Sequence, residues 1–187
     1  QRERARAART SRVRKLGMTA APLAASAALL FVLPAFTIAP ATSTQLPIVE
    51  QTIDWHKRGF PLEVKTADPV RVAQWFHGKV DFPVRLPQFK DRNVSLLGAR
   101  LANIEDQRAA YVEYDVEGTK MSVMMFPARG LEVPRDRIQS VEGRDVALMG
   151  ASGYGVAVLS DDHLTYTVTS ALSDHDFMQV MRASFAP

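Results

Sequence analysis

A run of 22 residues without a charged side chain, Met18–Ala39, constrains this chain more than any other feature of its sequence. It consists mainly of Ala, Leu, Val, Phe and Ile, and as a helix it would be roughly 33 Å long, about the thickness of a bilayer's hydrocarbon core. Pro22 falls near its start, where a missing N–H donor costs little, and Pro34 near its end, where a kink or a helix end is expected. We therefore predict a single transmembrane helix over residues 18–39.

The charges on either side of this segment predict its orientation. Residues 1–15 carry seven basic side chains and one acidic one, whereas no Lys or Arg follows the segment until Lys57. By the positive-inside rule, the basic arm 1–17 is expected in the cytoplasm and the C-terminal part of the chain on the other side of the membrane. Residues 40–47 form a predicted linker, and residues 48–187 a predicted exported domain.

Two other interpretations of the apolar run stay open. A cleavable signal peptide also has a basic start and an apolar stretch, and Ile38–Ala41 would be its cleavage site. The length of the run and the proline after the small residue weigh against it. A core helix is the other alternative, but an Ala-rich run with no polar face is hard to bury in so small a domain. Since the sequence begins with Gln1 rather than Met, we expect further protein upstream.

Charge and cysteine content exclude several classes of function. The whole chain has a net charge of +3, but residues 1–15 alone carry +6 and the remainder −3. A nucleic-acid-binding domain would instead need Lys and Arg clustered on a folded face. The sequence contains no cysteine, which removes disulfides, thiol nucleophiles and Cys-based metal sites.

The domain is predicted to be α+β, with a mostly antiparallel sheet flanked by helices. An amphipathic helix is expected over 48–58, with Ile48, Val49, Ile53 and His56 on one side. A second helix starts at the Asp68-Pro69 cap and ends at Gly78.

The remaining elements follow from alternation and turn residues. An extended edge segment is expected over 82–86, because prolines bracket it. Ser173 and Asp176 form a capping box that opens the last helix, with Phe177, Val180, Met181 and Phe185 on its apolar stripe. The predicted strands are 94–101, 109–116, 121–126, 146–149, 155–160 and 164–170, and the predicted loops are 103–107 and 128–145.

No motif in the sequence predicts catalysis, a cofactor or a metal site. The four histidines, His56, His77, His163 and His175, lack the spacing of metal ligands. His175 stands between two aspartates, but at a helix start, where acids are favoured in any case. The run GASGYG, residues 150–155, matches neither the nucleophile elbow nor the dinucleotide fingerprint. A glycine-rich turn is the simpler interpretation.

Several runs between residues 55 and 177 resemble the exported C-terminal domain of bacterial transmembrane anti-sigma factors. The runs are DPVRVAQWFHGKVDFPVRLPQF, LLGARLANIEDQRAAYVEYDVEG and GYGVAVLSDDHLTYTVTSAL, and they follow a single apolar span as in that family. A late tryptophan of the family pattern is missing, and Leu159 lies near its position. The motif positions of functional or structural weight are His56, Trp75, Phe76, Gly98, Arg100, Tyr114, Gly153, Tyr154 and Tyr166.

The resemblance implies signal transduction and regulation of transcription without catalysis. In this family a cytoplasmic segment, often with a His-x3-Cys-x2-Cys zinc motif, sequesters an extracytoplasmic-function sigma factor. The span and the exported domain govern its release, commonly through proteolysis. It implies a single-pass protein of the bacterial inner membrane with a periplasmic domain. The implied partners are the lipid bilayer, intramembrane-proteolysis machinery, and a sigma factor bound through a cytoplasmic region outside this sequence.

Two other functions remain open at this point. The chain would also suit a membrane-anchored periplasmic accessory or binding subunit of an envelope complex. A small envelope hydrolase or metal-binding protein would have to use His56, His77 or His163.

Overall fold

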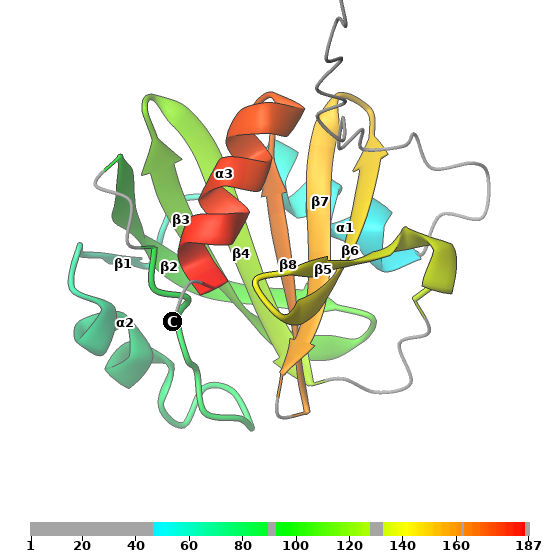
Figure 1. Ribbon diagram of the computed structural model, residues 1–187. Helices are drawn as coiled ribbons and strands as arrows, with labels where there is room; N and C mark the ends of the chain where they lie inside the picture. The colour runs from blue at the N-terminus through cyan, green and yellow to red at the C-terminus, as the bar shows by residue number, and fades with distance from the viewer. Residues whose placement is uncertain (1–46, 90–92, 128–132, 162, 186–187) are drawn as a thin grey trace, which may run out of the picture. The chain divides into compact units, whose positions relative to one another are not determined.

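The computed structural model describes residues 47–89, 93–127, 133–161 and 163–185 (Figure 1). The predicted basic arm, the predicted transmembrane segment 18–39 and nearly all of the linker lie outside these residues. Within the described ranges no helix is long and apolar enough to cross a membrane.

The strands of the described residues form one eight-stranded antiparallel sheet in the order β1-β2-β3-β4-β8-β7-β6-β5. Two four-stranded halves, β1 to β4 and β5 to β8, join where β4 pairs with β8 at the centre of the sheet. The strands are β1 (Val64–Lys65), β2 (Val94–Ile104), β3 (Gln107–Val116), β4 (Thr119–Pro127), β5 (Ile138–Val141), β6 (Arg144–Ala151), β7 (Tyr154–Asp161) and β8 (Leu164–Ser170).

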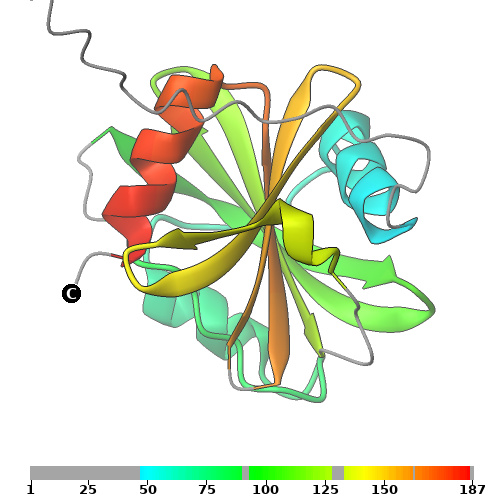
Figure 2. The same ribbon diagram turned by 45° about the vertical axis from the view of Figure 1, so that its right-hand side comes forward.

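Helices cover both faces of this sheet (Figures 1 and 2). Helix α1 packs on one face, and helices α2 and α3 pack on the other. The helices are α1 (Pro47–Arg58), α2 (Pro69–Phe76), α3 (Asp174–Phe185) and the short 3-10 turn η1 (Arg135–Arg137). The α+β prediction is therefore confirmed at the level of a single antiparallel sheet with flanking helices.

Two apolar cores result from this three-layer arrangement. Because side chains alternate along a strand, Met124 and Phe126 of β4 face α1, whereas Val123 and Met125 face α3. All seven residues of β8 are buried, since this central strand is covered on both faces. Three threonines of β8 lie on the α1 face beside Met124: Thr165, Thr167 and Thr169.

Helix boundaries agree with the predictions, because their signals are local. Ile48, Val49, Ile53 and His56 of α1 are all buried, as expected from their spacing. In α3 the Ser173 hydroxyl accepts from the Asp176 amide at 3.2 Å and donates to its carboxylate at 2.6 Å. The capping box is therefore confirmed. The predicted place of Phe185 on the apolar stripe concerns a side chain outside the described part of the structure.

Three predictions about strands and loops were wrong. Residues 82–86 are extended but pair with no strand, since Pro83 and Pro87 lack N–H donors; β1 forms that edge instead. Within the predicted loop 128–145, residues 138–141 form edge strand β5. The predicted loop 103–107 is a two-residue turn, because Glu105 and Asp106 both adopt positive φ and let β2 run directly into β3.

The start of α2 supports a first prediction. The Asp68 carboxylate accepts hydrogen bonds from the amides of Val70 at 2.9 Å and Arg71 at 3.4 Å. Asp68→Ala should lower the free energy of unfolding by about 1 kcal/mol in urea denaturation, because two helix N–H groups lose their acceptor. Asp68→Asn keeps an oxygen acceptor and should stay close to wild type. Equal losses in the two variants would contradict a capping role.

Candidate functional site

A buried polar cluster fastens α1 to the middle of the sheet. His56 lies in the last turn of α1 and is only 3% exposed. Its Nδ1 atom is 2.8 Å from the Oγ atom of Ser122 on β4, 66 residues further along the chain. The Tyr154 ring of β7 meets the His56 ring edge-on, with 5.2 Å between centroids. His56 therefore contacts two strands that are distant in the sequence.

Lys120 completes this cluster at the end of the helix. Its ammonium group donates to the backbone carbonyl oxygen of His56. The last carbonyls of a helix have no partner within the helix and carry partial negative charge. Lys120 satisfies one of them from β4, and α1 is thereby tied to the sheet through its backbone as well as its side chains.

The electrostatics keep the His56 imidazole neutral. The pKa of His56 is lowered to about 4, mainly by burial and to a smaller extent by the nearby Lys120 ammonium. At neutral pH the contact with Ser122 is therefore a hydrogen bond between two uncharged groups. Protonation of His56 would place a second cation beside Lys120 in a buried position.

An aromatic group beside the cluster holds the chain that leaves α1. The Arg100 guanidinium lies 4.7 Å from the ring centroid of Phe60 and 5.6 Å from that of Trp55. Arg100 also donates to the Pro61 carbonyl at 3.1 Å, and Trp55 Nε1 donates to the Asn103 carbonyl at 2.8 Å. Cation–π contacts and hydrogen bonds thus fix residues 55–61 against β2.

The chemistry of this cluster fits a structural contact that holds α1 on the sheet rather than a catalytic group. A serine within hydrogen-bond distance of a histidine is also the geometry of an activated nucleophile. Here, however, Ser122 is only 3% exposed beneath α1, and the lowered pKa of His56 makes its imidazole a weak base at neutral pH. Among the described residues, no carboxylate forms a hydrogen bond with His56. The hydrogen bond between His56 and Ser122 therefore satisfies two buried polar groups.

The predicted site residues fall on two faces of the sheet. His56, Arg100 and Tyr154 lie around α1 on one face. Tyr114, Tyr166 and Phe76 are buried on the opposite face, where Trp75 packs on Phe76 with 4.9 Å between ring centroids. The remaining two are glycines with positive φ: Gly98 in β2, which lies against β1, and Gly153 in the β6–β7 turn.

Sequence reasoning missed Ser122 and Lys120. Ser122 stands in the predicted strand 121–126 and was not distinguished from its apolar neighbours. Its signal was a single polar residue in a strand that otherwise consists of Met, Val and Phe. Buried polar groups are usually paired, so such a serine predicts a partner, although not which one.

The other histidines do not form a site. His77 and His163 are exposed, and exposed His175 lies 3.2 Å from the Asp176 carboxylate. Hydrogen bonds from Ser173 and then from His175 lower the pKa of Asp176. Among the residues that the structure describes, no group of three or more His, Asp or Glu side chains could hold a metal ion.

Comparison with protein-family models, with curated proteins and with solved structures gave no match.

Proposed function

We propose that this chain is the membrane anchor and periplasmic regulatory domain of an anti-sigma factor that controls an extracytoplasmic-function sigma factor without catalysis. The observation that carries the proposal is the attachment of α1 to the sheet through the His56–Ser122 hydrogen bond and the contact of Lys120 with the His56 carbonyl. α1 is the first described helix after the predicted anchor and linker. A domain whose first helix is held in this way can transmit a change in its sheet to the chain that precedes it.

The contacts explain how such coupling would work. Loss of the His56–Ser122 hydrogen bond and of the Lys120–carbonyl contact would free the end of α1 from β4. The populations of attached and detached α1 would then shift with any ligand or cleavage that favours one of them. In the regulatory model, detachment exposes the linker to proteases and releases the sigma factor. The bilayer, the protease and the sigma factor are the partners of this proposal, and nucleic acid is not one.

The test uses the intact gene product in its native host. Deletion of the gene is expected to raise transcription from promoters of one extracytoplasmic-function sigma factor. Lys120→Met should raise it in part, because α1 loses its backbone contact with β4. Lys79→Met is the matched control, since Lys79 contacts the Trp75 carbonyl and ring on the opposite face. Protein amounts are compared by immunoblot.

Two outcomes would contradict the regulatory proposal. Unchanged sigma-dependent transcription after deletion would remove it, and co-purification with other envelope proteins would then favour an accessory subunit. Equal effects of Lys120→Met and Lys79→Met at equal protein amounts would show that attachment of α1 does not carry the signal.

A further inference from the structure

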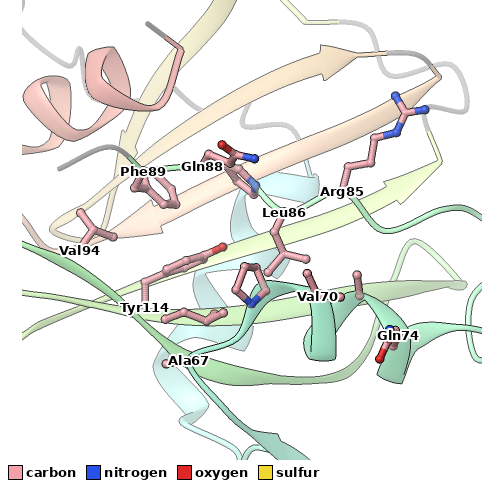
Figure 3. A pocket seen from close by; sticks show the side chains of 13 residues that line it. Ala67, Val70, Gln74, Arg85, Leu86, Gln88, Phe89, Val94 and Tyr114 are labelled. Carbon is pink, nitrogen blue, oxygen red and sulfur yellow. The ribbon is translucent and has the colours of Figure 1, made fainter. Parts of the chain in front are cut away.

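A groove opens on the sheet face opposite α1, between helix α2 and the extended segment 85–89 (Figure 3). We call it the α2 groove. Its volume is about 920 Å³, within the range of small-molecule sites. Residues from α2, the extended segment, β2 and β3 line it, among them Val70, Ala73, Leu86, Phe89, Val94 and Tyr114.

The polar side chains of the groove lie mainly at its rim. Gln74, Arg85 and Gln88 are exposed, whereas the side chains toward the sheet are apolar or aromatic. Val70 is also an apolar residue of this groove and is 60% exposed, which is high for a large aliphatic side chain beside a cavity. A ligand that covers it would gain the burial of this surface.

One buried polar group lies at the base of the groove, closed off from solvent. Tyr114 is 4% exposed, and its ring packs edge-on against Phe89 with 4.9 Å between centroids. Figure 3 shows its hydroxyl directed toward Leu86 under the extended segment. This hydroxyl has no hydrogen-bond partner among the described residues. Buried hydroxyl groups are nearly always paired, so an unpaired one at the base of a groove favours a ligand that shifts Leu86 and offers this hydroxyl an oxygen atom.

We propose that the α2 groove binds a neutral, mostly apolar small molecule that places one oxygen atom against the Tyr114 hydroxyl. The apolar lining selects an aliphatic or aromatic body, and the single buried hydroxyl selects one polar atom on it. Among the described residues that line the groove, only Arg85 is charged, and it stands at the rim, away from Tyr114 (Figure 3). A charged headgroup beside Tyr114 would therefore lose its hydration without a counter-charge. This proposal does not rest on the regulatory function above.

The test measures binding of 1-octanol to the full chain by NMR, with octanoate as the charged probe of equal chain length. Methyl resonances of Val70, Leu86 and Val94 report on the groove, and those of Ile53 on the opposite face are the internal control. Octanol is expected to shift the three groove methyls saturably and to leave Ile53 unchanged. Octanoate should bind at least about tenfold more weakly, because it carries a charge into an apolar site.

Two substitutions test the Tyr114 hydroxyl and the open volume of the groove separately. Tyr114→Phe keeps the ring and should weaken octanol binding about fivefold, the effect of one hydrogen bond. Its melting temperature should equal or exceed that of wild type, because the hydroxyl has no partner in the protein. Ala73→Leu should fill the groove and abolish binding. Ala171→Leu adds the same side chain at an exposed position away from the groove and should bind like wild type.

Several results would overturn this proposal. Absence of saturable shifts in the wild-type chain would show that the groove is not a site for such ligands. If Tyr114→Phe bound octanol as tightly as wild type, the hydroxyl would have no role in binding. If octanoate bound as tightly as octanol, the ligand would not need to be neutral. Groove shifts that follow protein concentration rather than octanol would mean that a second copy of the chain covers this face.

Discussion

Gly98→Ala is expected to destabilise the protein by about 2–4 kcal/mol, through overpacking combined with a positive backbone φ. Gly98 lies in β2 opposite Lys65 of β1, with φ at +152°. A Cβ atom at this position would lie 2.1 Å from the carbonyl oxygen of Val64 and 3.0 Å from the Cα atom of Lys65. Both neighbours are backbone atoms, which cannot rotate away as a side chain does.

The collision would push an entire segment off the sheet edge. The Glu63 amide donates to the Ala99 carbonyl at 2.9 Å, and the Glu63 carboxylate accepts from the Leu101 amide at 3.1 Å. Arg100 adds its hydrogen bond to the Pro61 carbonyl at 3.1 Å. Displacement of residues 61–65 would weaken these contacts together, so the loss should exceed that of a single hydrogen bond.

Gly143→Ala is the matched control for this prediction. Gly143 also has a positive φ, +79°, but no atom lies within 4 Å of the position that its Cβ would occupy. Gly143→Ala should therefore lower the free energy of unfolding by only about 1 kcal/mol, from backbone strain alone. Chemical denaturation of both variants measures the difference. Equal losses of stability would mean that the approach of β1 to Gly98 is not what requires glycine there.

Local signals account for the parts of the fold that the sequence predicted. The Asp68 cap and the Ser173–Asp176 capping box each depend on residues within four positions of one another. Strand β1 has no such signal. Its two residues pair with β2 because a glycine more than thirty positions later leaves room for the Val64 carbonyl.

The candidate site was predicted only in part, for the same reason. His56 and Tyr154 were selected by resemblance, but their contact depends on β4 pairing with β8 and on β8 pairing with β7. Pairings between strands that are far apart in the sequence leave no periodic signal in either strand. The partner of His56, Ser122, therefore became visible only in the three-dimensional arrangement.

Acidification is expected to weaken the fold through His56 by about 2–3 kcal/mol between pH 7 and pH 4. Burial and then Lys120 lower the pKa of His56 from 6.5 to about 4. Between these two values the unfolded chain binds more protons than the folded chain, so stability falls as the pH falls. The stabilisation is complete above the unfolded pKa and is lost as the pH approaches the folded one.

Two variants isolate the contribution of His56 from that of carboxylates, which also titrate at low pH. Because His56→Gln cannot take up a proton at this position, its free energy of unfolding, although lower at pH 7, should change less between pH 7 and pH 4.5 than that of wild type. His77→Gln removes an exposed histidine and should keep the wild-type slope. Urea denaturation at each pH gives the values. If His56→Gln retained the full wild-type slope, the buried imidazole would not be the group that acid acts on, and the weakening would have to come from carboxylates elsewhere in the domain.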